Sequence, residues 1–124
     1  AQHQPILDGN VKRILCRYYR VQGWSGHTNI QKQLWTLIEQ LTPQQCCADF
    51  NQALMDLGNL VCRPNQAHCH TCPLTKYCQA YQTGRPENYP HVVRRKPIPH
   101  YQVVVGIIWH GNRFLIQRRP ESGL

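Results

Sequence analysis

Four cysteines within one short stretch constrain this chain more than any other feature. Residues 62–78 read CRPNQAHCHTCPLTKYC, in which the thiols are separated by six, two and five residues. Structural zinc usually takes two CxxC-like knuckles joined by a longer span, and only one such knuckle is present. An iron-sulfur cubane is larger than a single ion, and four thiolates of one compact loop can reach its separate irons. The spacing favours a 4Fe-4S cluster, with the ligands Cys62, Cys69, Cys72 and Cys78.

Two alternatives to the cluster stay open from spacing alone. Zinc is one of them, because His68 and His70 could replace cysteine as ligands. Unliganded or disulfide-paired thiols are the other. Three further cysteines, at positions 16, 46 and 47, lie on predicted helices without a matching geometry, and we interpret them as ordinary small residues.

Composition indicates a partner and a compartment. Lys and Arg number 14 against 6 Asp and Glu, so that the formal charge is +8 and a polyanion such as nucleic acid is the default partner. Seven cysteines form an odd set, and no leader-like apolar segment opens the sequence, which favours a reducing cytoplasm. No apolar run approaches the length of a membrane span, so we expect a soluble protein and no membrane partner.

Hydrophobic periodicity predicts three helices before the cysteines. The first covers 8–22, with Asp8 as N-cap, Gly23 as its stop and a basic stripe of arginines at 13, 17 and 20 on the face opposite its apolar residues. The second covers 29–41, where Thr28 and Gln31 are spaced as a capping box. Thr42 is the predicted cap of the third helix, which runs directly into Cys62.

The chain changes character after the cysteines. Residues 79–100 are rich in proline and arginine without periodicity, and predict an extended basic linker. Residues 101–119 hold two β-branched and aromatic runs on either side of HGN, which predicts a hairpin. The expected fold is mainly α, followed by a short β segment.

The C-x6-C-x2-C-x5-C pattern after a helix written FNQALMDLGNLVC resembles the iron-sulfur loop of the helix-hairpin-helix DNA glycosylase superfamily. PILDGNVKRIL is similar to the segment that carries the catalytic aspartate in the MutY-type adenine glycosylase branch. The continuation VVVGIIWHGNRFLIQRRPESGL resembles the opening of the Nudix-like C-terminal domain of that branch, whereas endonuclease III relatives tend to end soon after the cluster.

The resemblance implies three regions and a missing remainder. Residues 1–82 would be a partial glycosylase domain with the cluster loop, 83–100 an interdomain linker, and 101–124 the start of a truncated Nudix-like α/β domain. In the family, a catalytic glutamate and a helix-hairpin-helix of LPGVG type lie farther upstream. Apart from Asp8, none of the six acidic residues stands in a matching catalytic context, so this stretch alone is expected to be inactive.

The resemblance also assigns roles to single residues. Asp8 would stabilise the sugar cation or attack it, although an aspartate before an amphipathic helix is ordinarily only an N-cap. Asn10 would orient Asp8 or water. Lys12 would approach the abasic sugar, with a solvated helix lysine as the alternative. Gln52 would lie near the flipped adenine, with an exposed helix glutamine as the alternative.

Arg63 and Lys76 would contact the DNA backbone from a loop that the cluster braces. The implied partner is double-stranded DNA with A opposite 8-oxoguanine or G, bound by a monomer in the bacterial cytoplasm near the nucleoid. The implied activity is base excision repair, by hydrolysis of the N-glycosidic bond of the mispaired adenine. A non-catalytic zinc- or cluster-bearing DNA-binding module is the alternative function, and an endonuclease III-type pyrimidine glycosylase is disfavoured by DGN and by the C-terminal continuation.

Overall fold

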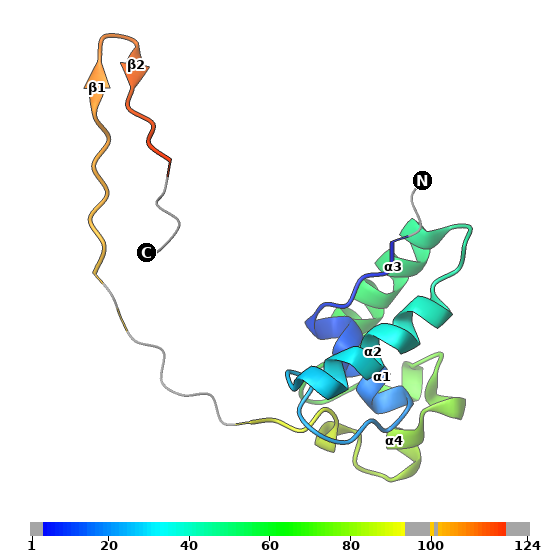
Figure 1. Ribbon diagram of the computed structural model, residues 1–124. Helices are drawn as coiled ribbons and strands as arrows, with labels where there is room; N and C mark the ends of the chain where they lie inside the picture. Colours follow the sequence, from blue (N-terminus) through cyan, green and yellow to red (C-terminus); the bar gives the residue numbers. More distant parts are fainter. Residues whose placement is uncertain (1–3, 94–99, 101, 119–124) are drawn as a thin grey trace. The chain divides into compact units, whose positions relative to one another are not determined.

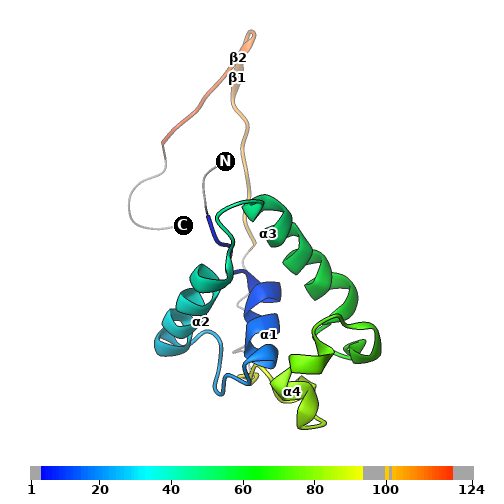
Figure 2. The same ribbon diagram turned by 90° about the vertical axis from the view of Figure 1, so that its right-hand side faces the viewer.

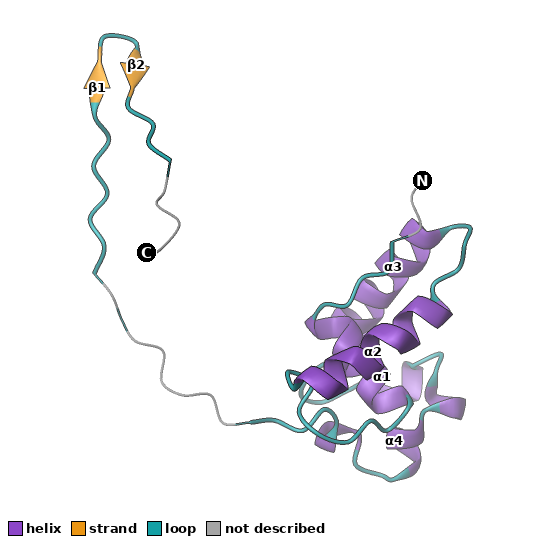
Figure 3. Ribbon diagram, viewed as in Figure 1, coloured by secondary structure: helices purple, strands orange, loops and turns teal. Residues whose placement is uncertain are grey.

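The computed structural model describes residues 4–93, 100 and 102–118. The chain divides into two compact units, Ala1–Arg94 and Arg95–Leu124 (Figure 1). The first unit is helical and the second holds a small hairpin, as the secondary structure in Figure 3 shows. Among the described residues, no helix combines the length and the apolarity needed to cross a bilayer.

Helix α1 (Gly9–Tyr18) begins at the predicted cap, because Asp8 Oδ1 accepts a hydrogen bond of 2.8 Å from the Val11 amide. Its end was predicted too late. Arg20 takes the left-handed conformation (φ 51°), and the Val21 amide donates to the Cys16 carbonyl at 3.0 Å. This bond closes a Schellman-type C-terminus, so that the helix ends at Tyr18 and not near Gly23.

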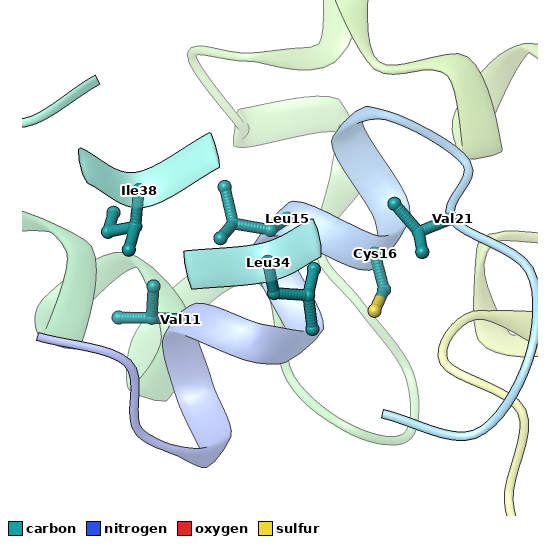
Figure 4. Close-up of a cluster of buried hydrophobic side chains, with 6 residues drawn as sticks. All are labelled: Val11, Leu15, Cys16, Val21, Leu34 and Ile38. Atoms are coloured by element: carbon teal, nitrogen blue, oxygen red, sulfur yellow. The ribbon is translucent and has the colours of Figure 1, made fainter. Parts of the chain in front are cut away.

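Helix α1 lies at the centre of the first unit, with α2 (Thr28–Leu41) on one side and α3 (Cys47–Asp56) on the other (Figure 2). Leu34 and Ile38, one turn apart on α2, are fully buried against α1. Figure 4 shows the cluster they form. Its six members are Val11, Leu15, Cys16, Val21, Leu34 and Ile38. Burying each aliphatic side chain of this size contributes about 1.5–3 kcal/mol, which fixes α1 in place.

Both predicted caps between the helices were wrong. Helix α2 already begins at Thr28, after His27 as its N-cap, while the side-chain amide of Gln31 donates to the Gly26 carbonyl at 3.1 Å. The Thr42 hydroxyl bonds back to the Ile38 carbonyl at 2.7 Å, so this residue closes α2 and does not start α3. Helix α3 therefore begins only at Cys47.

Helix α3 continues into a π-helix, η1 (Leu57–Val61), that delivers the chain to Cys62, as the sequence predicted. The remaining elements of the unit are short: η2 (Cys69–Thr71), η3 (Thr75–Tyr77), α4 (Gln79–Gln82) and η4 (Pro86–Asn88). Helix α4 lies against α1. Near the end of the unit, a bridge pairs Trp24 with His91, whose amide donates to the Gly23 carbonyl at 3.3 Å.

The second unit contains the predicted hairpin. Strands β1 (Trp109–His110) and β2 (Arg113–Phe114) are antiparallel, with Trp109 opposite Phe114. The turn between them places Gly111 at φ 57°, a conformation that suits glycine. The rest of 101–119 that is described has no strand assignment, so the paired region is shorter than the apolar runs suggested.

Candidate functional site

The proposed catalytic residue stands at the N-terminus of the central helix. Asp8 is half-buried and uses one carboxylate oxygen to cap α1. Two residues later, Asn10 is also half-buried, and its side-chain amide donates to Asn59 Oδ1 at 3.2 Å. The first turn of α1 is thereby joined to the π-helix η1.

Arg13 connects Asn10 to the cysteine loop. Its guanidinium donates to Asn10 Oδ1 at 2.9 Å, to the Gly58 carbonyl at 2.7 Å and to the Cys62 carbonyl at 2.7 Å. Burial lowers the pKa of this guanidinium below its usual value, while the nearby Cys62 opposes the shift. The three acceptors offset the cost of burying the cation.

Gly58 allows this close approach. A Cβ atom at position 58 would lie 2.6 Å from Asn10 Cβ, which is closer than such atoms come in real structures. Only a residue without a side chain lets η1 lie directly on the first turn of α1. The segment that ends at Cys62 and the segment that starts at Asp8 are thus held against each other.

Arg17, one turn after Arg13, is only 2% exposed and forms the main clamp on the loop. Its guanidinium donates five hydrogen bonds, four to main-chain carbonyls and one to a cysteine sulfur. The acceptors are Pro86 O (3.1 Å), Tyr89 O (3.0 Å), Arg63 O (2.6 Å), Pro64 O (2.9 Å) and Cys62 Sγ (3.3 Å). One buried side chain therefore ties the start of the cysteine loop to the segment that follows it.

The four cysteines of the loop line one cavity beside α1. Its cavity volume is about 30 Å³, within about 300 Å³ of space between atoms that includes open solvent. The cysteines at its wall are Cys62, Cys69, Cys72 and Cys78, together with Arg17 and His68. All four thiols are half-buried. His70, the other candidate zinc ligand, does not line this cavity.

The backbone of the loop places successive cysteines through short turns. The Cys72 amide donates to the Cys69 carbonyl at 3.2 Å, and the Cys78 amide donates to the Thr75 carbonyl at 3.2 Å. The Thr75 hydroxyl lies against the carbonyls of both Cys69 and Cys72. Thr75 therefore fixes the CxxC turn from within.

The thiols are close enough to influence one another. Burial raises the pKa of Cys69, and the charges of the other three cysteines raise it further, while Arg17 acts in the opposite direction. Within the described residues, no group of three or more His, Cys, Asp or Glu has the geometry that would hold a single metal ion.

The other residues singled out in the sequence lie around this centre. Lys12 is half-buried on α1. Gln52 is exposed on α3 and donates to Asp56 Oδ1 at 2.9 Å, so its amide already has a partner. Arg63 and Lys76 are exposed on the cysteine loop, and Lys76 Nζ lies 5.3 Å from the ring centre of Tyr77.

Sequence reasoning missed the role of two arginines. Arg13 and Arg17 were interpreted as part of a basic stripe on the face opposite the apolar residues, but both are buried and bonded to the loop; only Arg20 is exposed. The sequence of the helix carries no signal for this role, because most of the acceptors of both guanidinium groups lie far along the chain.

Comparison with solved structures places this helical unit in a known class. A thermostable thymine-DNA glycosylase matches 66% of this chain with a TM-score of 0.58 and 32% identity, over 37% of its own length. Two thirds of the chain thus share part of the fold of a DNA glycosylase. No family model matches the chain.

Proteins that are similar to this chain in sequence are adenine DNA glycosylases. An adenine DNA glycosylase of Buchnera aphidicola (Schizaphis graminum) is 40% identical over 118 residues, which are 95% of this chain and 34% of the relative. The Arabidopsis thaliana adenine DNA glycosylase is 31% identical over 97% of this chain, and the human one is 42% identical over 66%. The chain is homologous to adenine DNA glycosylases over the segment that it spans, about a third of the length of the bacterial relatives.

Proposed function

We propose that this chain forms the part of an adenine DNA glycosylase that carries the catalytic aspartate and the cysteine loop. The observation that carries the proposal is the position of Asp8. Its half-buried carboxylate starts a helix whose next turns are bonded to η1 and to the loop. The homology to adenine DNA glycosylases over 95% of the chain supports the same assignment.

The chemistry needs a carboxylate of this kind. Release of adenine breaks the bond between the base and deoxyribose, and the sugar then carries positive charge in the transition state. A fixed carboxylate stabilises that charge, while an acid protonates the departing base. Asp8 would supply the first group, and Asn10 would orient Asp8 or the attacking water because Arg13 and Asn59 hold its amide. The acid is expected outside these residues.

The substrate would reach Asp8 as a flipped nucleotide. Adenine inside a duplex is shielded by stacking, so the enzyme must extrude it before cleavage. Lys12, on the same turn of α1, would approach the sugar or a phosphate, and Gln52 would turn its amide from Asp56 toward the base. We propose A opposite 8-oxoguanine or G in double-stranded DNA as the substrate of the whole protein, acting as a monomer in the bacterial cytoplasm.

The activity is tested on the chain extended to the full length of its relatives. Adenine release from a duplex with A opposite 8-oxoguanine is expected for the extended protein, and Asp8→Asn is expected to abolish it. The 124-residue chain alone is expected to bind without cleaving. Full release by the Asp8→Asn variant would end the catalytic assignment, and DNA binding without release by the extended wild-type protein would favour a non-catalytic module.

We further propose that the cysteine loop holds a 4Fe-4S cluster. The residues fit such a group, because four thiols line one cavity and Arg17 adds a cationic donor to its wall. A single zinc ion is the less favoured alternative, since only one CxxC-like knuckle is present. When bound, the cluster would brace the loop and would do no chemistry on the base.

Metal analysis tests the cofactor directly. Protein purified without oxygen is expected to contain about four irons and four acid-labile sulfides per chain. Stoichiometric zinc without sulfide would contradict the cluster. The measurement does not depend on glycosylase activity, so the two proposals can fail separately.

The exposed cations of the braced loop are proposed to contact DNA phosphates. Each phosphate contact that is lost should lower the salt slope of DNA binding by about one unit. Lys76→Gln and Arg63→Gln are therefore expected to show a smaller slope, measured by fluorescence anisotropy between low and moderate salt. Lys32 is exposed on α2, so Lys32→Gln is the matched control and should keep the wild-type slope. Equal slopes in all four proteins would rule out contacts from the loop.

The second unit is proposed to open a Nudix-like domain that follows a linker over 83–100. It exposes large apolar side chains, among them Val104, Ile108 and Trp109. An exposed apolar run of this kind is expected to be covered by further structure. The start of the proposed linker is held on the first unit by hydrogen bonds from Arg17 and by the bond between His91 and Gly23.

A further inference from the structure

The four cysteines of the cavity differ in their neighbours. Arg17 Nη1 donates to Cys62 Sγ at 3.3 Å, which gives this sulfur a guanidinium donor. The sulfur of Cys78 lies 3.6 Å from the Arg17 main-chain carbonyl. A carbonyl only accepts hydrogen bonds and cannot donate one to a thiolate. A cationic N–H is therefore directed at one end of the ligand set.

The guanidinium cannot turn away from the sulfur. Four of its five hydrogen bonds go to carbonyls, two at the start of the loop and two in the 86–89 segment that follows it. These bonds fix the plane of the guanidinium group. At 2% exposure, its charge acts through protein and not through water, so its effect on a nearby thiolate is screened little.

A hydrogen bond to a ligating sulfur draws electron density from it and stabilises an added negative charge on the cluster. Such bonds are among the factors that set the reduction potential of iron-sulfur clusters. We propose that Arg17 is a positioning residue that raises the reduction potential of the cluster through Cys62, in addition to joining the loop to the 86–89 segment. This inference rests on the proposed 4Fe-4S cofactor.

The experiment compares two substitutions that both conserve charge. Arg17→Lys removes the buried fork, whereas Arg20→Lys alters an exposed arginine at the end of the same helix. Iron and sulfide content is measured first, since failure to find the cluster would overturn the proposed cofactor and not merely the role of Arg17. Potentials are then measured by voltammetry on proteins with a full cluster.

For Arg17→Lys, we expect a lower potential, with at least a tenfold change in the oxidised-to-reduced ratio at a fixed potential. For a one-electron couple this corresponds to about 59 mV. Arg20→Lys should keep the wild-type value. If Arg17 only held the loop, the Arg17→Lys protein with a full cluster would keep the wild-type potential, and that result would overturn the proposal.

A second measurement uses the unaltered sequence, because Arg17→Lys could lose the cluster. Wild-type protein is grown with arginine labelled with ¹⁵N in the guanidino group only, and the cluster is brought to a paramagnetic state. Pulsed electron paramagnetic resonance should then detect a guanidino nitrogen coupled to the cluster, and Arg13→Lys, which removes the other guanidinium beside Cys62, should retain the coupling. A cluster without such a coupling in wild-type protein would overturn the proposal.

Discussion

Asp8 has two roles that single substitutions can separate. Its carboxylate caps α1 through the Val11 amide, and under the proposed function it also faces the sugar cation. Asparagine caps helices as well as aspartate does, whereas alanine at a cap costs about 1 kcal/mol. We expect Asp8→Asn to leave the free energy of unfolding almost unchanged and Asp8→Ala to lower it by about 1 kcal/mol.

Urea unfolding with the metal retained measures this difference. Both variants should lack adenine release when the extended protein is assayed. If Asp8→Asn were as unstable as Asp8→Ala, the cap would need the negative charge, and loss of activity could no longer be assigned to chemistry alone.

Cys16 makes a prediction about alkaline pH. Burial in the core raises the pKa of its thiol from 9.0 to about 11. The native state therefore keeps this proton where the unfolded chain loses it, so the stabilisation is complete below pH 9 and is lost as the pH rises to 11. Between these values, we expect wild-type protein to lose about 1 kcal/mol per pH unit relative to Cys16→Ala.

Chemical unfolding at several pH values gives, for each protein, the slope of the free energy of unfolding against pH. Cys16→Ala removes the thiol and shares every other titrating group, so only the difference between the slopes matters. Parallel slopes would show that the thiol is not held protonated. Native protein should also resist alkylation at Cys16 near neutral pH, because the side chain is fully buried.

At the scale of elements, the contact between η1 and α1 depends on Gly58. A Cβ atom there would meet Asn10 at 2.6 Å, so one of the two elements must move. We expect Gly58→Ala to cost about 1–3 kcal/mol of stability, as overpacked sites do. We also expect it to displace Asn10 and to lower adenine release more than binding of DNA.

Gly9→Ala is the matched control, since a Cβ atom at that exposed helical position has nothing within 4 Å. Replacing glycine there should raise stability by about 0.4–1 kcal/mol through the unfolded chain. Thermal unfolding of both variants measures these two changes in stability. A Gly58→Ala protein as stable as Gly9→Ala would show that the close approach of η1 can relax freely.

Elements could be predicted from the sequence where their causes are local. The Asp8 cap, the helical spacing of Leu34 and Ile38 and the HGN turn each depend on neighbours within a few residues. The prediction of Thr42 as the cap of α3 was wrong, because its hydroxyl donates to the Ile38 carbonyl, one turn earlier in α2.

The site itself was predictable only in part. The cysteine spacing identified the loop, and the structure brings all four thiols to one cavity. The roles of Arg13 and Arg17 could not be predicted, because all their acceptors except Asn10 lie between 45 and 72 residues farther along the chain. Periodicity placed both on a helix but could not say that carbonyls of a distant loop would surround them.

At the scale of the whole molecule, the hydrophobic core and the cysteine loop are held by different forces. The buried cluster draws on α1, α2 and the turn between them, and contains no residue of 62–78. The loop is held by arginine hydrogen bonds and by short turns around a cavity. Without ligands on its thiols, the loop should open while the helices persist, because it buries little apolar surface.

Trypsin reports this difference at one peptide bond. Removing metal with a chelator and a mild oxidant should raise the rate of cleavage after Lys76 by about tenfold, whereas cleavage after Lys32 in α2 should change little. Arg63 and Arg85 each precede proline and resist the protease, so Lys76 is a clean probe of the loop. Equal rates with and without metal would mean that the arginines alone hold the loop, and faster cleavage at both lysines would mean that the metal supports the entire helical unit.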